Sequence, residues 1–137
     1  MSYVSLRQKS RYLKEITKGA SKELRNDEVT ACESYADVYI EGMLGKSFDM
    51  FSDSYPELIV RVADMLASAM AWQYLHAGQS PKESTYASIL KKQADEILKK
   101  IVNGEMGIKN PDGTWDEDYP GKKNAEDKVR SGLEIIV

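Results

Sequence analysis

The sequence predicts an all-α protein: a small domain of about four helices around a central apolar helix, followed by an extended C-terminal arm. Residues 56–75, PELIVRVADMLASAMAWQYL, are apolar on nearly every face, so other protein must surround a helix formed there. Residues 80–104 read as a capped amphipathic helix, and residues 26–44 repeat apolar side chains every three or four positions. We expect residues 1–107 to form the helical domain and residues 108–137 to form a turn or hairpin and the arm.

The composition fits one soluble domain. The chain has 137 residues, a formal net charge of -3, and 42% hydrophobic and 30% charged residues, which is ordinary for a globular protein with a single core. The first ten residues lack the apolar run of a signal peptide. Charges at Arg61 and Asp64 argue against a membrane span at residues 58–75. Cys32 is the only cysteine, so no internal disulfide is possible, and a reducing, cytoplasmic setting fits.

The first 25 residues are basic, with seven Lys or Arg side chains against Glu15 and Glu23. Such a segment suits nucleic acid or an acidic protein surface, or it is a solvated helix face. We expect a weak helix over residues 6–18, stopped by Gly19.

The helix over residues 26–44 should begin at Asn26 or Asp27 and be ended by Gly42 and Gly45. That series contains Val29, Cys32, Ala36, Tyr39 or Ile40, and Met43. Cys32 lies within it and should be a small buried hydrophobe. Glu33, Asp37 and Glu41 share another face; such a row binds a divalent metal or forms an acidic solvated or interface surface.

The loop at residues 45–56 carries Phe48, Phe51 and Tyr55, which should pack on the domain or on a neighbour. The polar stripe of the central helix should be its exposed edge or a subunit contact, and it comprises Glu57, Arg61, Asp64 and Ser68.

The last helix should start at Ser80, with Pro81 in the first turn and Glu83 completing a capping box. Its expected buried stripe is Tyr86, Leu90, Ala94, Ile97 and Ile101. We expect Leu66, Met70, Leu90 and Ile97 to share one core.

Beyond Glu105 the helical period is lost. Residues 110–113, NPDG, predict a turn flanked by Ile108 and Trp115 in a small hairpin. Residues 116–132 are too polar for the core, whereas the chain ends in an apolar run that suits a β-strand added to a partner. The expected docking residues are Trp115, Tyr119, Leu133, Ile135, Ile136 and Val137.

Catalytic patterns are scarce. His76 is the only histidine, which leaves one base or ligand for a triad or a two-histidine metal site, and its place at a helix end suits a cap. The sequence contains neither G-x-x-x-x-G-K-[ST] nor G-x-G-x-x-G, and no E-x-x-H accompanies the carboxylate row. We therefore expect a structural or binding protein, without enzymatic activity, cofactor or metal.

The order of elements resembles the head-completion proteins of tailed phages, the head-tail connectors or adaptors beneath the portal. The resemblance covers about residues 29–107 and rests on apolar patterns. It comprises the helix ending in YADVYIEGML, the aromatic- and proline-containing loop, the helix PELIVRVADMLASAMAWQYL, and a helix Y-x-x-x-L-x-x-x-A-x-x-x-L that closes on I-x-N-G. The family pattern A-x-x-x-I-x-x-Y-L is matched loosely at Ala36, Ile40, Met43 and Leu44.

This resemblance implies a virion protein, made in the host cytoplasm, that assembles as a ring, commonly a dodecamer, on the portal protein after genome packaging. The ring extends the DNA channel without sequence-specific DNA binding and offers a platform to a tail-side stopper or tail-completion protein. In such a ring a basic arm can meet a neighbour's acidic face. The expected interface residues are Arg7, Arg11, Lys14, Glu33, Asp37 and Glu41. The alternatives are a small helical nucleic-acid-binding regulator that uses the basic segment and, last, a metal-dependent enzyme built on the carboxylate row.

Overall fold

The computed structural model describes residues 2–20, 22–45, 48, 54–76 and 85–122, and this part of the chain is all-α. Its helices are α1 (Leu6–Lys9), α2 (Leu13–Thr17), α3 (Asn26–Leu44), α4 (Glu57–Leu75) and α5 (Tyr86–Val102). The predicted helix over residues 6–18 is in fact two short helices, because Ser10 has an extended backbone conformation. Ser80, Pro81 and Glu83, the predicted cap of the last helix, lie outside the described residues.

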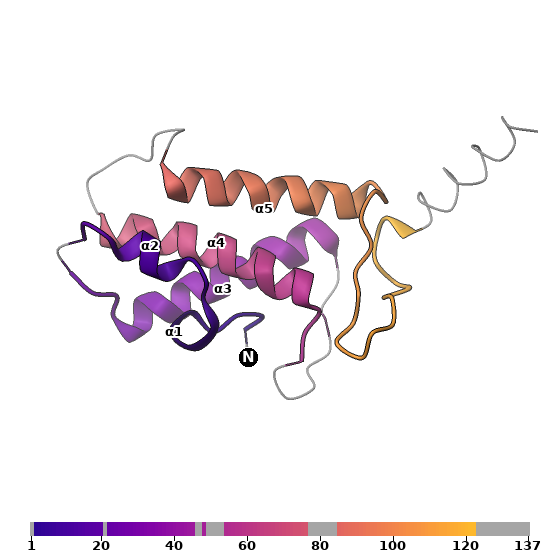
Figure 1. Cartoon of the computed structure of the whole chain (residues 1–137), viewed down its shortest axis with the longest axis horizontal. Helices are drawn as coiled ribbons and strands as arrows, with labels where there is room; N and C mark the ends of the chain where they lie inside the picture. The colour runs from indigo at the N-terminus through magenta and orange to yellow at the C-terminus, as the bar shows by residue number, and fades with distance from the viewer. Residues whose placement is uncertain (1, 21, 46–47, 49–53, 77–84, 123–137) are drawn as a thin grey trace, which may run out of the picture.

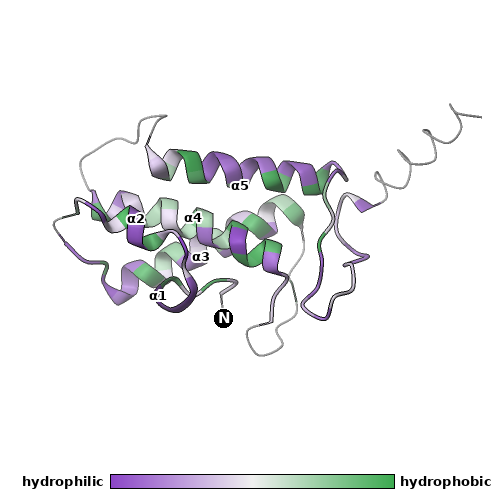
Figure 2. Cartoon of the chain, viewed as in Figure 1, coloured by the Kyte–Doolittle hydropathy of each residue, from purple (hydrophilic) through white to green (hydrophobic). Residues whose placement is uncertain are grey.

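The central helix is α4, as predicted. It packs against α3 on one side and α5 on the other, and α1 and α2 contact it as well (Figure 1). Every residue from 62 to 69 is buried, and Figure 2 shows apolar residues where α3, α4 and α5 face one another. Leu66 and Leu90 are fully buried, while Met70 and Ile97 are half-buried against the same core.

The α3 helix follows the predicted apolar period, with Cys32, Ala36 and Ile40 completely buried. Its start differs slightly from the prediction. Arg25 is the N-cap residue, and its amide donates to the Glu28 carboxylate at 3.0 Å. Gly42 lies within the helix, in contrast to the prediction, and the helix ends at Leu44. Gly45 follows with a φ of 65°, and its amide donates to the Glu41 carbonyl at 2.7 Å.

Two predicted faces need correction. In α4, Asp64 and Ser68 are 3% and 0% exposed, so the polar stripe is not an exposed edge throughout; hydrogen bonds to the N-terminal segment make this burial possible. In α5, Tyr86 is exposed and Ile97 only half-buried. The buried series is Ala87, Leu90, Ala94, Leu98 and Ile101, which matches three of the five predicted positions and shifts the other two by one residue.

The predicted hairpin follows α5. Lys109 and Trp115 form an antiparallel bridge, and Gly113 takes the positive φ of 93° that the turn requires. Residues 116–122 then return to the domain: Asp116 is buried, and a Cβ on Gly121 would lie 2.0 Å from the Ile101 carbonyl oxygen. The prediction that the residues from 116 onward are too polar for the core is therefore wrong for Asp116, whereas Glu117 and Asp118 are exposed.

Candidate functional surfaces

The acidic row of α3 binds the beginning of its own chain. The main-chain amides of Tyr3 and Leu6 donate to Asp37 Oδ1 at 3.0 Å and to Glu33 Oε2 at 2.9 Å. The Tyr3 hydroxyl donates to Glu41 Oε1 at 2.6 Å. We call residues 3–13 the N-terminal clasp, because they form hydrogen bonds to α3 here and to α4 further along the segment.

Asp37 and Tyr3 both have raised pKa values where the clasp meets the row. Burial raises the pKa of Asp37, although the amide of Tyr3 acts in the opposite direction. Burial and the hydrogen bond to Glu41 raise the pKa of the Tyr3 hydroxyl. Phe48 and Tyr55 pack edge-on against the Tyr3 ring, at 6.0 and 4.9 Å between centroids, as expected of the loop aromatics. Phe51 lies outside the described residues.

A second carboxylate holds the other end of the clasp. Asp64 of α4 accepts hydrogen bonds from Ser10 Oγ at 2.6 Å, from the Arg11 amide at 2.7 Å and from Ser68 Oγ at 3.1 Å. Ser10 Oγ in turn lies 3.1 Å from the Leu13 amide at the start of α2. This partly buried cluster joins the start of α2 to α4. No local pattern predicts it, because Ser10 and Arg11 are 54 and 53 residues away from Asp64 in the chain.

The predicted interface residues are not paired with each other within the described protomer. The Arg7 guanidinium donates to the Leu24 carbonyl at 3.1 Å and to Asn26 Oδ1 at 2.9 Å. Arg11 lies 3.7 Å from Glu57, and Lys14 is exposed. Glu33, Asp37 and Glu41 instead accept hydrogen bonds from the clasp. Their pairing across subunits remains a prediction.

Of the predicted docking residues, Trp115 and Tyr119 are described. Trp115 is 63% exposed, and Lys109 Nζ lies 6.0 Å from its ring centroid. Tyr119 is half-buried against the core. Leu133, Ile135, Ile136 and Val137 lie outside the described residues.

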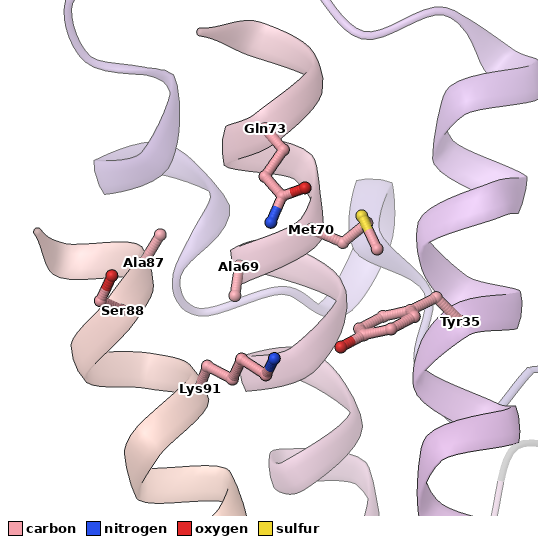
Figure 3. A pocket seen from close by; sticks show the side chains of 7 residues that line it. All are labelled: Tyr35, Ala69, Met70, Gln73, Ala87, Ser88 and Lys91. Carbon is pink, nitrogen blue, oxygen red and sulfur yellow. The ribbon is translucent and has the colours of Figure 1, made fainter. Parts of the chain in front are cut away.

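A small hollow opens between α3, α4 and α5 (Figure 3). Tyr35 comes from α3, Met70 and Gln73 from α4, and Ser88 and Lys91 from α5; Ala69 and Ala87 form the rest of its lining. Its volume is about 60 Å³, far below the roughly 300–1,000 Å³ of a typical small-molecule site. We assign it no ligand.

The contacts of Cys32 and His76 are those of structural residues. Cys32 is fully buried, and burial raises the pKa of its thiol to about 12. His76 is the C-cap residue of α4; its Nε2 lies 3.3 Å from the Ile16 carbonyl oxygen and its ring stacks on Trp72. Within the described ranges, no group of three or more His, Cys, Asp or Glu side chains is arranged to hold a metal ion. None of the helices in these ranges meets the length and hydropathy needed to cross a membrane.

Comparison with known proteins identified no relative of the chain. No family model matches the chain, and no significant match was found among curated proteins or solved structures. Function must therefore be argued from the residues and the fold.

Proposed function

We propose that the protein is a structural head-tail connector of a tailed phage, which assembles as a ring beneath the portal. In this role it extends the DNA channel and presents a platform to the next tail-side protein. DNA passes through the ring without sequence-specific contacts, and the protein catalyses no reaction.

The observation that carries the proposal is the order and packing of the helices. The segments on which the sequence resemblance rests correspond to α3, α4 and α5. The apolar segment expected at the centre is α4, which contacts each of the other helices in the described structure. A helical block of this kind suits a protomer that works by contact with its neighbours.

The proposal is tested by mixing the purified full-length protein with portal assemblies of candidate tailed phages. We expect electron microscopy and native mass spectrometry to show a ring of the protein on one end of the portal. A variant with one exposed substitution on α5, Glu96→Lys, serves as a control for the effect of a surface charge change. A protein that leaves every portal bare and remains monomeric would contradict the proposal.

A second candidate, a nucleic-acid-binding regulator, rests on the exposed basic segment. Its exposed side chains are Arg7, Lys9, Arg11, Lys14, Lys18, Lys22 and Arg25. However, α1 and α2 have only four and five residues, which is short for a helix that reads the major groove. This candidate would be favoured if the protein bound no portal and reduced the gel mobility of a DNA fragment at physiological salt.

A further inference from the structure

We infer that Asn103, at the carboxyl end of α5, is a site of spontaneous deamidation, and that the packing of residues 116–122 on this end of the helix restrains the reaction. Asn103 is exposed and is followed by Gly104. In such a pair the main-chain nitrogen of the glycine can attack the side-chain amide of the asparagine. Glycine has no Cβ to hinder the approach, so this pair closes the ring more easily than asparagine followed by a bulkier residue.

The reaction needs only water as a co-reactant, with hydroxide as the base. The main-chain nitrogen of Gly104 loses its proton and forms a bond to Cγ of Asn103. The bond from Cγ to the side-chain nitrogen breaks, and that nitrogen leaves as ammonia after taking a proton from water. Water then opens the resulting succinimide ring at either carbonyl carbon. The products are aspartate and isoaspartate, in which the main chain runs through the former side chain.

The folded end of α5 holds this pair in a geometry that is unsuited to ring closure. Gly104, with a φ of 78°, donates its amide hydrogen to the Ile101 carbonyl at 3.2 Å, and the Glu105 amide donates to the Lys100 carbonyl at 2.8 Å. These two bonds form a Schellman cap. Asn103 has a ψ of -2°, which eclipses the Gly104 nitrogen with the backbone nitrogen of Asn103 and turns it away from Cβ. The hydrogen bond must therefore break, and the main chain must rotate, before the nitrogen can reach Cγ.

Residues 116–122 hold the cap in this geometry. Beyond α5 the chain returns to the carboxyl end of that helix (Figure 1). A Cβ on Gly121 would clash with the Ile101 carbonyl oxygen and with the nitrogen and Cα of Gly104. Gly121 thus lies against both ends of the hydrogen bond that has to break. The cap opens only when residues 116–122 move away from α5, so the rate of deamidation should follow this local opening and not global unfolding.

The test compares the full-length protein in its folded state and unfolded in guanidinium chloride. Both samples are incubated at mildly alkaline pH, and peptide mapping by mass spectrometry measures aspartate and isoaspartate at position 103. We expect Asn103 to react at least about tenfold more slowly in the folded protein. Asn103→Gln should remove the signal. Asn110 is an internal reference, because the nitrogen of Pro111 has no hydrogen to lose.

Two variants loosen the packing of residues 116–122. Gly121→Ala introduces the clash with the cap, whereas Tyr119→Ala removes a side chain that is half-buried against the core and introduces no clash. Tyr119→Ala therefore keeps the test decisive if Gly121→Ala does not fold. Each folded variant should deamidate at least about threefold faster than the wild type. Met70→Ala is the control, because it weakens the core at α4 and should leave the rate at Asn103 close to that of the wild type.

Equal rates in the folded and unfolded wild type, or no reaction at Asn103 in the unfolded chain, would overturn the inference. It would also fail if the folded Tyr119→Ala variant reacted at the wild-type rate, or if Met70→Ala accelerated the reaction as much as Tyr119→Ala.

Discussion

Asp37 of α3, which binds the N-terminal clasp, shows how a single residue makes stability depend on pH. Its carboxylate accepts a hydrogen bond from the Tyr3 amide, and burial is the main cause of its raised pKa. A carboxyl whose pKa is higher in the folded protein than in the unfolded chain contributes stability below the unfolded value. That contribution is lost as the pH rises through the folded value.

The substitution Asp37→Asn tests this effect. It keeps an oxygen acceptor for the Tyr3 amide but cannot ionise, so its stability relative to the wild type should rise as the pH increases from 3.8, the ordinary value of Asp, through the higher pKa of the folded protein. Urea denaturation of both proteins at a series of pH values measures the difference, with Glu96→Gln as a reference at an exposed position. A difference that falls with pH would contradict the assignment.

Gly121 carries a second prediction at this scale. A Cβ there would lie 2.0 Å from the Ile101 carbonyl oxygen and 2.4 Å from the Gly104 amide nitrogen, and neither backbone atom can move aside like a flexible side chain. Gly121→Ala should destabilise the protein by about 1–3 kcal/mol or more. The control is Gly42→Ala, which meets open space within α3 and should stabilise by about 0.5–1 kcal/mol. Equal melting temperatures for the two variants would show that residues 116–122 do not press on α5.

Among the described helices, α4 contributes more residues to the core than any other, because α3 and α5 cover it from both sides. Leu66 is completely buried on α4, and Leu90 is 2% exposed on α5. Leu66→Ala and Leu90→Ala should each cost about 2–5 kcal/mol of unfolding free energy. Met70→Ala, at a half-buried position of α4, should cost less. Denaturant midpoints that leave either leucine variant unchanged would show that these faces are not packed.

The periodicity of apolar residues was enough to predict α3 and α5, because burial on one helix face leaves a regular trace in the sequence, and the long apolar run was enough to predict α4. It could not predict that Asp64 is buried. The partners of that carboxylate, Ser10 and the Arg11 amide, belong to another segment, and only the tertiary fold brings them together. The same holds for the contact of Glu33 and Asp37 with main-chain amides, since any residue except proline supplies an amide. The one-residue errors at Tyr86 and Ile97 arise because the apolar residues of α5 cover a wider face of the helix than the face that is buried.

At the scale of the whole molecule, the C-terminal boundary of the folded unit decides how the docking arm should be tested. Asp116 is buried and Gly121 contacts the end of α5. Removing residues 116–137 should therefore lower the melting temperature, although their sequence suggests that residues 116–132 are too polar for the core.

Deleting residues 123–137 alone removes the apolar terminal run while keeping every contact of residues 116–122 with the domain. We expect this truncation to preserve the melting temperature and to abolish binding to the portal or to a neighbouring subunit. Calorimetry and the portal-binding assay measure the two effects. If the truncated protein unfolds, the terminal run belongs to the protomer's own core. If the truncated protein still docks, the terminal run has no docking role.

The positions of the two tryptophans make assembly visible by intrinsic fluorescence. Trp72 is half-buried near the carboxyl end of α4 and stacks on His76 at 4.8 Å between ring centroids, whereas Trp115 is largely exposed on the hairpin at the other end. Trp115 should therefore emit at longer wavelengths in the free protomer, and covering it should shift emission to the blue. Trp72→Phe leaves Trp115 as the only tryptophan, so the fluorescence of the unlabelled protein can report in real time when Trp115 becomes covered.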